Sequence, residues 1–133
     1  ALHESLVILK EEGLENSWKR HMQNHLALKA GLESMGINFI VNEGQRLPQL
    51  NSVTIPDGVD EAQVRSQLLQ DYNLEIGAGL GALAGKVWRI GLMGYASNKT
   101  NVLRCLNALG SVLNASGQSI DISAAVHAAQ ATY

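Results

Sequence analysis

Cysteine, proline and aromatic residues are scarce in this sequence of 133 residues, which contains one Cys, two Pro and 5% aromatic residues. The single cysteine, Cys105, excludes an internal disulfide and therefore favours a reducing compartment. We expect a cytoplasmic location, or an organellar one if the source is eukaryotic. Cys105 lies within an apolar helical pattern, which indicates a buried core thiol rather than a nucleophile.

The sequence also lacks a basic cluster and a long apolar run. Its ten Lys and Arg residues are scattered, and the formal net charge is −2. No basic patch is available to neutralise a phosphate backbone, so we expect no nucleic-acid partner. The apolar runs are far shorter than the roughly 20 residues that cross a bilayer, so we expect no membrane partner.

An initiator Met and a charged leader are missing as well. The first twelve residues already show helical periodicity, with Leu2, Leu6 and Leu9 at helical spacing and no obvious capping residue before them. We therefore expect the chain to be a piece of a longer polypeptide, either a truncated form or a proteolytic product.

The residues that are present are typical of one globular domain. Hydrophobic residues make up 46% and charged residues 17% of a chain long enough to bury a core. The patterns predict helices over 1–12, 14–35, 61–72 and 97–117, and strands over 37–41, 50–55, 74–76 and 86–92. These strands are too close in sequence for repeated parallel crossovers. We therefore predict an α+β fold, with a small, mainly antiparallel sheet and helices packed on one face.

The helix predicted over 14–35 carries two histidines four residues apart, His21 and His25. We place both on the side of the helix expected to face the core, which is formed by Leu14, Trp18, Met22, Leu28, Leu32 and Met35. Histidines at this spacing can bind a metal, but the zincin glutamate is absent between them and no third ligand is evident. We therefore expect ordinary hydrogen-bonded histidines and no metal site.

A glycine-rich stretch, Gly77 to Gly85, invites comparison with phosphate-binding loops. The Walker spacing fails, because Leu80 stands where the first glycine is needed and Val87 follows Lys86. A dinucleotide fingerprint opens a helix, whereas the pattern that follows this stretch predicts a strand. The glycines by themselves indicate only a tight turn or a close approach of the backbone.

Arg89 is the strongest candidate for binding a ligand. Alternation along the strand over 86–92 predicts a core face formed by Trp88, Ile90 and Leu92. The opposite face then holds Arg89 between Val87 and Gly91, and the glycine leaves open space beside the guanidinium. A guanidinium on a rigid strand is a planar, two-pronged donor, called the fork below, and can bind a carboxylate through two parallel hydrogen bonds. From the residues alone, a surface or salt-bridged arginine remains the alternative.

Three blocks of the sequence together resemble the alanine–glyoxylate and serine–pyruvate aminotransferases, which are class V enzymes dependent on pyridoxal phosphate. The blocks are residues 12–21 (EGLENSWKRH), 46–56 (RLPQLNSVTIP) and 74–94 (LEIGAGLGALAGKVWRIGLMG). The third block is the most specific, and Asn101-Val102 fits the same pattern. The resemblance spans roughly residues 1–117.

The resemblance implies that residues 1–117 are the C-terminal small domain of such an enzyme. Residues 1–13 would end a helix leading from a large domain, and residues 118–133 would be an Ala-rich tail with a possible helix. In this family the arginine of the Arg-Ile-Gly-Leu block binds the α-carboxylate of the amino or oxo acid, which places that role on Arg89. The implied function is transfer of an amino group from alanine or serine to glyoxylate, by a homodimer when the protein is full-length.

The family holds pyridoxal phosphate mainly in the large domain, as a Schiff base on a lysine. No lysine of this chain has a similar sequence context, as seen from Lys10, Lys19, Lys29, Lys86 and Lys99. We therefore expect no catalytic, cofactor-binding or metal-binding residue here, and no activity from the 133 residues alone. The alternative is a non-catalytic α+β interaction or regulatory module, since the chain contains no complete catalytic set.

Overall fold

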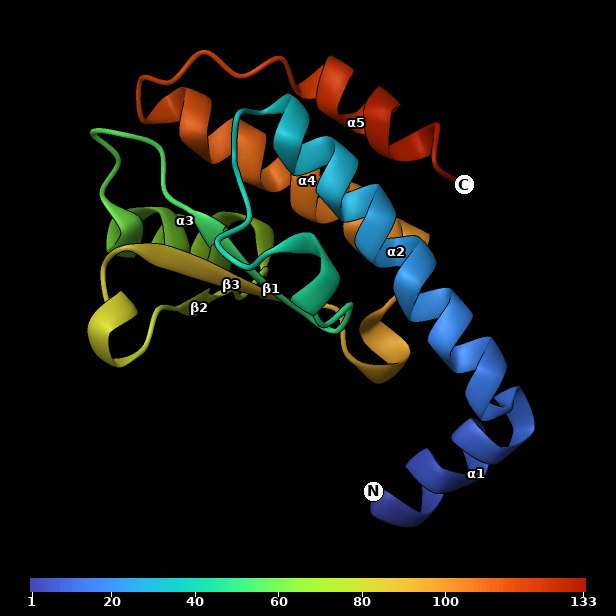
Figure 1. Cartoon of the computed structure of the whole chain (residues 1–133). Coiled ribbons are helices and arrows are strands. Elements are labelled where there is room, and N and C mark those ends of the chain that lie inside the picture. Colours follow the sequence, from blue (N-terminus) through green and yellow to red (C-terminus); the bar gives the residue numbers. More distant parts are fainter.

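The computed structural model describes every residue from Ala1 to Tyr133. Its helices are α1 (Leu2–Glu12), α2 (Leu14–Ser34), α3 (Glu61–Tyr72), α4 (Lys99–Ala115) and α5 (Ile122–Gln130). Its strands are β1 (Leu50–Thr54), β2 (Gly77–Ala78) and β3 (Val87–Gly91), with short 3-10 turns at Glu43–Gln45, Gly81–Leu83 and Gly94–Ala96. Figure 1 shows α2, α3, α4 and α5 as a layer on one side of the small sheet, with α1 apart from this layer beyond the start of α2. The α+β class predicted from the sequence is confirmed.

The sheet has three antiparallel strands in the order β1-β3-β2, so β3 is central. In this register Arg89 on β3 lies opposite Ser52 on β1 and Gly77 on β2. Directly opposite residues of an antiparallel pair point to the same face. The side chains that surround Arg89 therefore come from both neighbouring strands.

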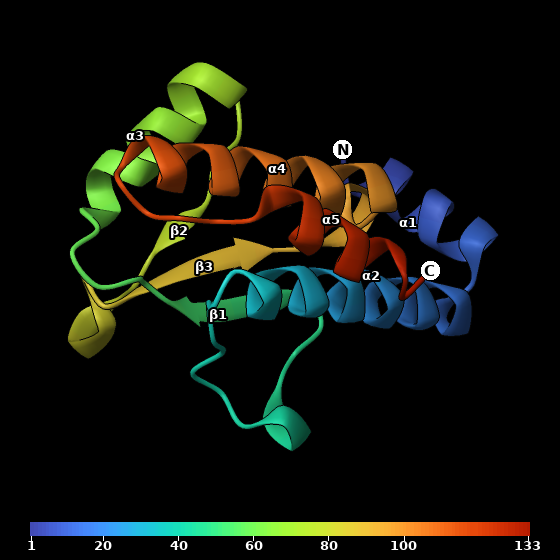
Figure 2. The same ribbon diagram turned by 90° about the horizontal axis from the view of Figure 1, so that it is seen from above.

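The core lies between the sheet and the helices and contains 21 buried apolar residues. Trp88 is fully buried within it, and its indole Nε1 donates a 3.4 Å hydrogen bond to the carbonyl oxygen of Glu61 at the start of α3. Helices α2 and α4 approach closely where α2 carries Gly31, because a Cβ at that position would lie 2.3 Å from Cδ1 of Leu106. Figure 2 shows α5 lying over α2 and α4.

Local capping fixes where three of the helices begin. Asp60 accepts hydrogen bonds from the backbone of Ala62 and Gln63 at the start of α3. Asn98 caps α4 and Asp121 caps α5 in the same way. These side chains satisfy N–H groups that the first helical turn leaves without partners. The observed start of α4 at Lys99 corrects the predicted start at Ser97 by two residues.

Two of the predicted strands are wrong in extent. The segment predicted as a strand over 37–41 makes only an isolated bridge from Phe39 to Val53 of β1, because the chain turns away after Ile40. The segment predicted as a strand over 74–76 pairs with no other strand, and pairing begins only at Gly77, where the backbone comes alongside β3.

The prediction of which α2 residues face the core is correct for only half of the six residues. Leu28, Leu32 and Met35 are buried, but Leu14, Trp18 and Met22 are 55%, 60% and 46% exposed. The first half of α2 instead buries polar residues, namely Ser17, His21, Asn24 and His25. Part of this half lies against the Gly94–Asn98 loop, whose backbone carbonyl and N–H groups require polar partners rather than apolar ones.

The tail forms helix α5, which packs on α2 and α4. Ala125 and Ala129 are fully buried, and the terminal Tyr133 hydroxyl donates a 2.6 Å hydrogen bond to Oδ1 of Asn24. Gly110 on α4 permits this packing, since a Cβ there would lie 2.7 Å from Cγ1 of Ile122. None of the five helices has the combination of length and apolar composition that a membrane crossing requires.

Candidate functional site

Arg89 lies at the middle of the central strand and is half-buried. Its neighbours Trp88 and Ile90 are buried on the helix-covered face, so the alternation predicted from the sequence is observed. Its Nε donates a 2.7 Å hydrogen bond to the carbonyl oxygen of Ala78 on β2. This bond fixes the guanidinium along the β2 backbone and leaves the two terminal nitrogens, Nη1 and Nη2, at the free end of the fork.

Two glycines on the same face of the sheet lie next to Arg89, one across the strand pair and one along its own strand. A Cβ on Gly77, directly across the strand pair, would lie 3.3 Å from Nη2 of Arg89, so the fork occupies room that a side chain would otherwise take. A Cβ on Gly91 would meet nothing nearer than Cε of Met93 at 4.0 Å. The guanidinium therefore lies against the backbone of β2, and the next position on this face of β3, Gly91, is open.

No acidic residue pairs with Arg89. The three ion pairs of the chain join Arg20 to Glu12, Lys29 to Glu43 and Arg65 to Glu61. Nη1 and Nη2 of Arg89 make no hydrogen bond within the chain, and neither is among the buried atoms that lack a partner. A charged fork with two free, accessible N–H ends is suited to a carboxylate, which can accept both hydrogen bonds in one plane.

The face of the sheet that carries Arg89 is only partly covered. Ser52 and Thr54 of β1 are half-buried on it, and Gly91 is exposed. Val87 shares this face but is 2% exposed, because the loop after β2 folds over it. That loop needs glycine at position 79, where a Cβ would lie 1.9 Å from the carbonyl oxygen of Leu83 and 3.0 Å from Cγ2 of Val87. The glycine-rich stretch thus serves a close backbone approach.

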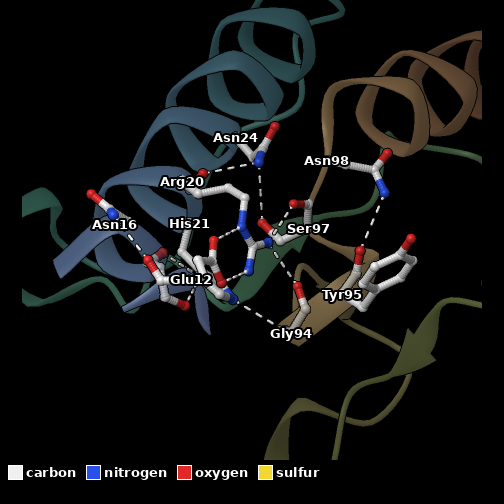
Figure 3. Close-up of polar contacts among 10 residues, drawn as sticks. Glu12, Asn16, Arg20, His21, Asn24, Gly94, Tyr95, Ser97 and Asn98 are labelled. Atoms are coloured by element: carbon white, nitrogen blue, oxygen red, sulfur yellow. Dashed lines mark hydrogen bonds and ion pairs between the residues drawn. The ribbon is translucent and has the colours of Figure 1, made fainter. Parts of the chain in front are cut away.

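A second polar cluster, which the sequence analysis missed, surrounds Arg20 on α2 (Figure 3). Nε and Nη2 of Arg20 donate to the two carboxylate oxygens of Glu12 at 2.5 and 2.8 Å. Nη1 donates to the carbonyl oxygens of Gly94 and Ser97 at 2.8 and 2.7 Å. One guanidinium therefore links the end of α1, helix α2 and the loop that follows β3.

The two histidines that sequence analysis singled out are hydrogen-bonded within the fold. Nδ1 of His21 is 2.6 Å from the Ser17 carbonyl oxygen, and its Nε2 accepts a 3.1 Å bond from the Gly94 N–H. Nδ1 of His25 is 2.6 Å from Oδ1 of Asn51 on β1. Both rings are buried, whereas Trp18 on the same side of the helix is 60% exposed. No group of three potential metal ligands forms anywhere in the chain.

A hollow of about 690 Å³ lies between α1, the start of α2 and the Gly94–Asn98 loop. Its apolar lining includes Ile8, Leu9 and Tyr95, and the Glu12–Arg20 ion pair forms part of its wall. The hydrogen bonds and the positive charge of Arg20 lower the pKa of the Glu12 carboxyl, so Glu12 is held in its charged form. The polar groups of this wall are thus already paired with one another.

Arg46 supplies a further cation beside β1. Its guanidinium lies 4.5 Å from the centroid of the Phe39 ring, and its Nε donates to the Val41 carbonyl oxygen at 2.8 Å. Its Nη1 is buried without a hydrogen-bond partner in the chain. Arg46 and Phe39 line a small cavity of about 150 Å³ that is separate from the larger hollow. Arg46 had no predicted role, although it begins the second of the three blocks that resemble the aminotransferases.

The residues of this chain do not fit the role of holding pyridoxal phosphate. A lysine that binds the cofactor aldehyde needs a sheltered amine with a lowered proton affinity. Four of the five lysines are exposed, and the fifth, Lys29, is engaged with the Glu43 carboxylate. Cys105 offers no alternative nucleophile, because complete burial raises the pKa of its thiol to about 12.

No model of a protein family matches this chain. The (S)-ureidoglycine–glyoxylate transaminase of Bacillus subtilis is 40% identical over all 133 residues. The crystal structure of this Bacillus subtilis aminotransferase superposes with a TM-score of 0.95 and 39% identity over 99% of the chain. An alanine–glyoxylate aminotransferase from Nostoc sp. superposes with a TM-score of 0.82 and 48% identity over 84% of the chain.

The chain spans about one third of each of these proteins, namely 32% of the Bacillus subtilis sequence and 30% of the Nostoc chain. The match to the Bacillus protein includes α5, so the similarity extends beyond residue 117, where the sequence resemblance was expected to end. The structural superposition and the sequence identity therefore both relate nearly the whole chain to the same aminotransferase. The chain belongs to the class V aminotransferase family and corresponds to the C-terminal part of these enzymes.

Proposed function

We propose that this chain is the substrate-binding small domain of a pyridoxal-phosphate-dependent aminotransferase that moves an amino group from alanine or serine to glyoxylate. The observation that carries the proposal is the unpaired fork of Arg89, pinned at Nε by the Ala78 carbonyl oxygen and free at both terminal nitrogens. All amino donors and oxo acceptors of such a reaction share one α-carboxylate. A single cationic fork can therefore serve both half-reactions.

The geometry suits Arg89 to orienting the substrate. Its strand is hydrogen-bonded on both sides, to β1 and to β2, and is anchored in the core by Trp88. A carboxylate held by two parallel bonds has few orientations left, and restriction of this kind lowers the entropic part of a barrier. Bound pyridoxal phosphate would supply the electron sink for chemistry at the α-carbon. Because no lysine here fits that cofactor, the large domain would hold it.

Glyoxylate is better supported as the acceptor than any one compound is as the donor. Both the Bacillus subtilis and the Nostoc relative have glyoxylate in their names, whereas the named donors are (S)-ureidoglycine and alanine. The space beside Gly77 and Gly91 places no bulky side chain next to the fork. Alanine, serine and (S)-ureidoglycine are therefore the donors to compare, each with glyoxylate as the common acceptor.

The large domain is the first partner in this proposal, since each relative contains about twice as much additional chain as these 133 residues. Small amino acids and oxo acids are the ligands, and a homodimer is the expected assembly of the full-length enzyme. The runner-up, a non-catalytic interaction module, has less support because the named relatives are transaminases. Because no lysine of this chain fits the cofactor, the 133 residues alone would catalyse no transamination.

The test is a titration of the complete gene product that contains these residues with L-alanine, followed through the visible absorbance of the bound cofactor. Hydrogen bonds to charged groups contribute about 1.5–3 kcal/mol, so we expect Arg89→Ala to weaken binding roughly 10- to 100-fold. Arg89→Lys keeps the charge but loses the planar fork, and should give an intermediate affinity. The cofactor absorbance itself should remain.

Arg65→Ala is a matched control, because Arg65 lies on α3 and its fork is already paired with Glu61. Its affinity for L-alanine should equal that of the unmodified protein. Loss of the cofactor absorbance in Arg89→Ala would contradict the proposed role, since Arg89 would then serve the cofactor or the fold. Full transaminase activity from the 133 residues alone would contradict the division of labour between the domains.

A further inference from the structure

Gly77 lies on the edge strand β2, at a position where the backbone does not require glycine. Its φ is not among the positive values that seven other glycines of the chain adopt. Glycine also weakens a strand, because it offers no side chain to pack against its neighbours. The surroundings of position 77, rather than its own conformation, therefore account for the glycine.

The neighbour that a side chain at position 77 would meet is Arg89. The three atoms nearest to a Cβ there are Nη2 of Arg89 at 3.3 Å and Cβ and Nε of Arg89, each at 3.5 Å. Gly77 lies directly opposite Arg89 in the pairing of β2 with β3, so the two positions share one face of the sheet. A side chain at position 77 would therefore press on the Arg89 guanidinium.

The guanidinium has little room to move while it keeps its present hydrogen bond. Its Nε donates at 2.7 Å to the carbonyl oxygen of Ala78, the residue next to Gly77, so it lies close along the β2 backbone. The 3.3 Å contact is shorter than the optimal separation of about 3.5–4.0 Å between non-bonded carbon atoms. A side chain at position 77 would therefore displace Nη2 and lengthen or break the bond from Nε, which would change the direction of both free nitrogens.

We propose that Gly77 is a positioning residue for substrate binding, because its missing side chain lets the Arg89 guanidinium lie on β2 and so fixes the direction in which the fork meets a carboxylate. This inference rests on the proposed function, and Gly77 acts only through Arg89. Two parallel hydrogen bonds depend on the plane and direction of the guanidinium. A misplacement of about 1 Å can cost roughly 100-fold in rate, so a smaller shift of the fork should still weaken carboxylate binding measurably.

The test compares L-alanine with ethylamine, which has the same amine and carbon skeleton but no carboxylate. Binding of each compound to the complete gene product is followed through the visible absorbance of the bound cofactor. We expect Gly77→Ala to weaken L-alanine binding roughly threefold and Gly77→Val roughly tenfold, with ethylamine binding unchanged. Gly44→Ala is the matched control, because its φ is not positive and a Cβ there meets nothing within 4 Å. It should bind both compounds like the unmodified protein.

Arg89→Ala, alone and combined with Gly77→Val, shows whether Gly77 acts through the fork. Gly77→Val should cause no further loss of L-alanine binding in the Arg89→Ala background, because the group that it displaces is gone. A further loss there would overturn the inference. Unchanged L-alanine affinity in both Gly77 variants would also overturn it, as would an equal loss for ethylamine, which would indicate damage to the fold or to the cofactor site.

The same measurements separate this inference from the proposed function. Normal L-alanine binding by Arg89→Ala alone would contradict the proposed function, and the role of Gly77 would fail with it. Weak L-alanine binding by Arg89→Ala, together with normal binding by both Gly77 variants, would contradict only the role of Gly77.

Discussion

Arg20 and Glu12 meet in a two-point ion pair, with Nε to Oε1 at 2.5 Å and Nη2 to Oε2 at 2.8 Å, across the bend between α1 and α2. The remaining nitrogen of the same guanidinium donates to two backbone carbonyl oxygens of the loop after β3. Removal of either partner therefore affects α1 and this loop together.

The first prediction concerns acid stability. Hydrogen bonding and charge from Arg20 lower the pKa of Glu12 below its ordinary value of 4.5, so the pair stabilises the fold above that value. The contribution is lost as pH falls through the lowered pKa of the folded state. Glu12→Gln should therefore reduce the free energy of unfolding near neutral pH, and the difference from the unmodified chain should shrink in acid, as measured by urea unfolding at several pH values. Glu11→Gln, which removes a neighbouring exposed carboxylate that forms no ion pair, is the charge-matched control.

The second prediction concerns the contact between α2 and α4. Gly31→Ala gains about 1 kcal/mol of helix propensity but places a Cβ 2.3 Å from Cδ1 of the fully buried Leu106. Overpacking in a core costs about 1–3 kcal/mol, so we expect a net loss of about 1 kcal/mol in chemical denaturation. In a Leu106→Ala background the same change should stabilise the chain. Gly44→Ala, where a Cβ meets nothing within 4 Å, serves as the control.

The third prediction concerns Cys105. Its thiol is fully buried on α4 with a pKa raised to about 12, so the reactive thiolate is rare in the native state at neutral or mildly alkaline pH. Iodoacetamide should leave the native chain unmodified over hours at pH 8 and should alkylate it completely in strong denaturant. Rapid alkylation of the native chain would show that α4 opens locally or that the thiol is accessible.

The fourth prediction concerns the buried pair of Asn51 and His25. Asn51 Oδ1 lies 2.6 Å from the His25 ring, and Nδ2 donates to the Ile90 carbonyl oxygen at 3.2 Å. Asn51→Leu leaves the buried His25 ring nitrogen without its partner, and a buried unsatisfied group costs about 1–3 kcal/mol. We expect a loss of about 1–3 kcal/mol in thermal or urea unfolding. Asn107→Leu, at an exposed site on α4, should change stability by less than about 0.5 kcal/mol. A similar loss in both variants would contradict the structural role of the pair.

Local sequence signals predicted much of this fold, because helix caps and strand alternation act over a few residues. Asp60 before α3 and the alternation around Arg89 are both observed as expected. The missed strand boundaries have a different cause. Pairing of Phe39 and of Gly77 depends on which distant backbone lies alongside, and neither propensity nor periodicity contains that information.

The position of Arg89 could also be predicted from the sequence, but its surroundings could not. Arg89 stood out because a charged residue interrupts an apolar strand pattern beside Gly91. Its hydrogen bond to Ala78 and the room left by Gly77 come from strand pairing, which the sequence pattern did not fix. The Arg20 cluster had no signal, since its partners lie eight and more than seventy residues away. The exposure of Trp18 could have been suspected only from the polar residues interleaved with it on α2.

The alternation along β3 also bears on how such a domain can diversify. Residues that face the helices, such as Trp88, are tied to many neighbours, so most exchanges there would cost stability. Positions opposite Arg89 in the sheet, such as Ser52 and Gly77, share its face without belonging to the packed interior. Under the proposed role of Arg89, exchanges on one face of the three-stranded sheet can alter substrate preference while the other face preserves the scaffold.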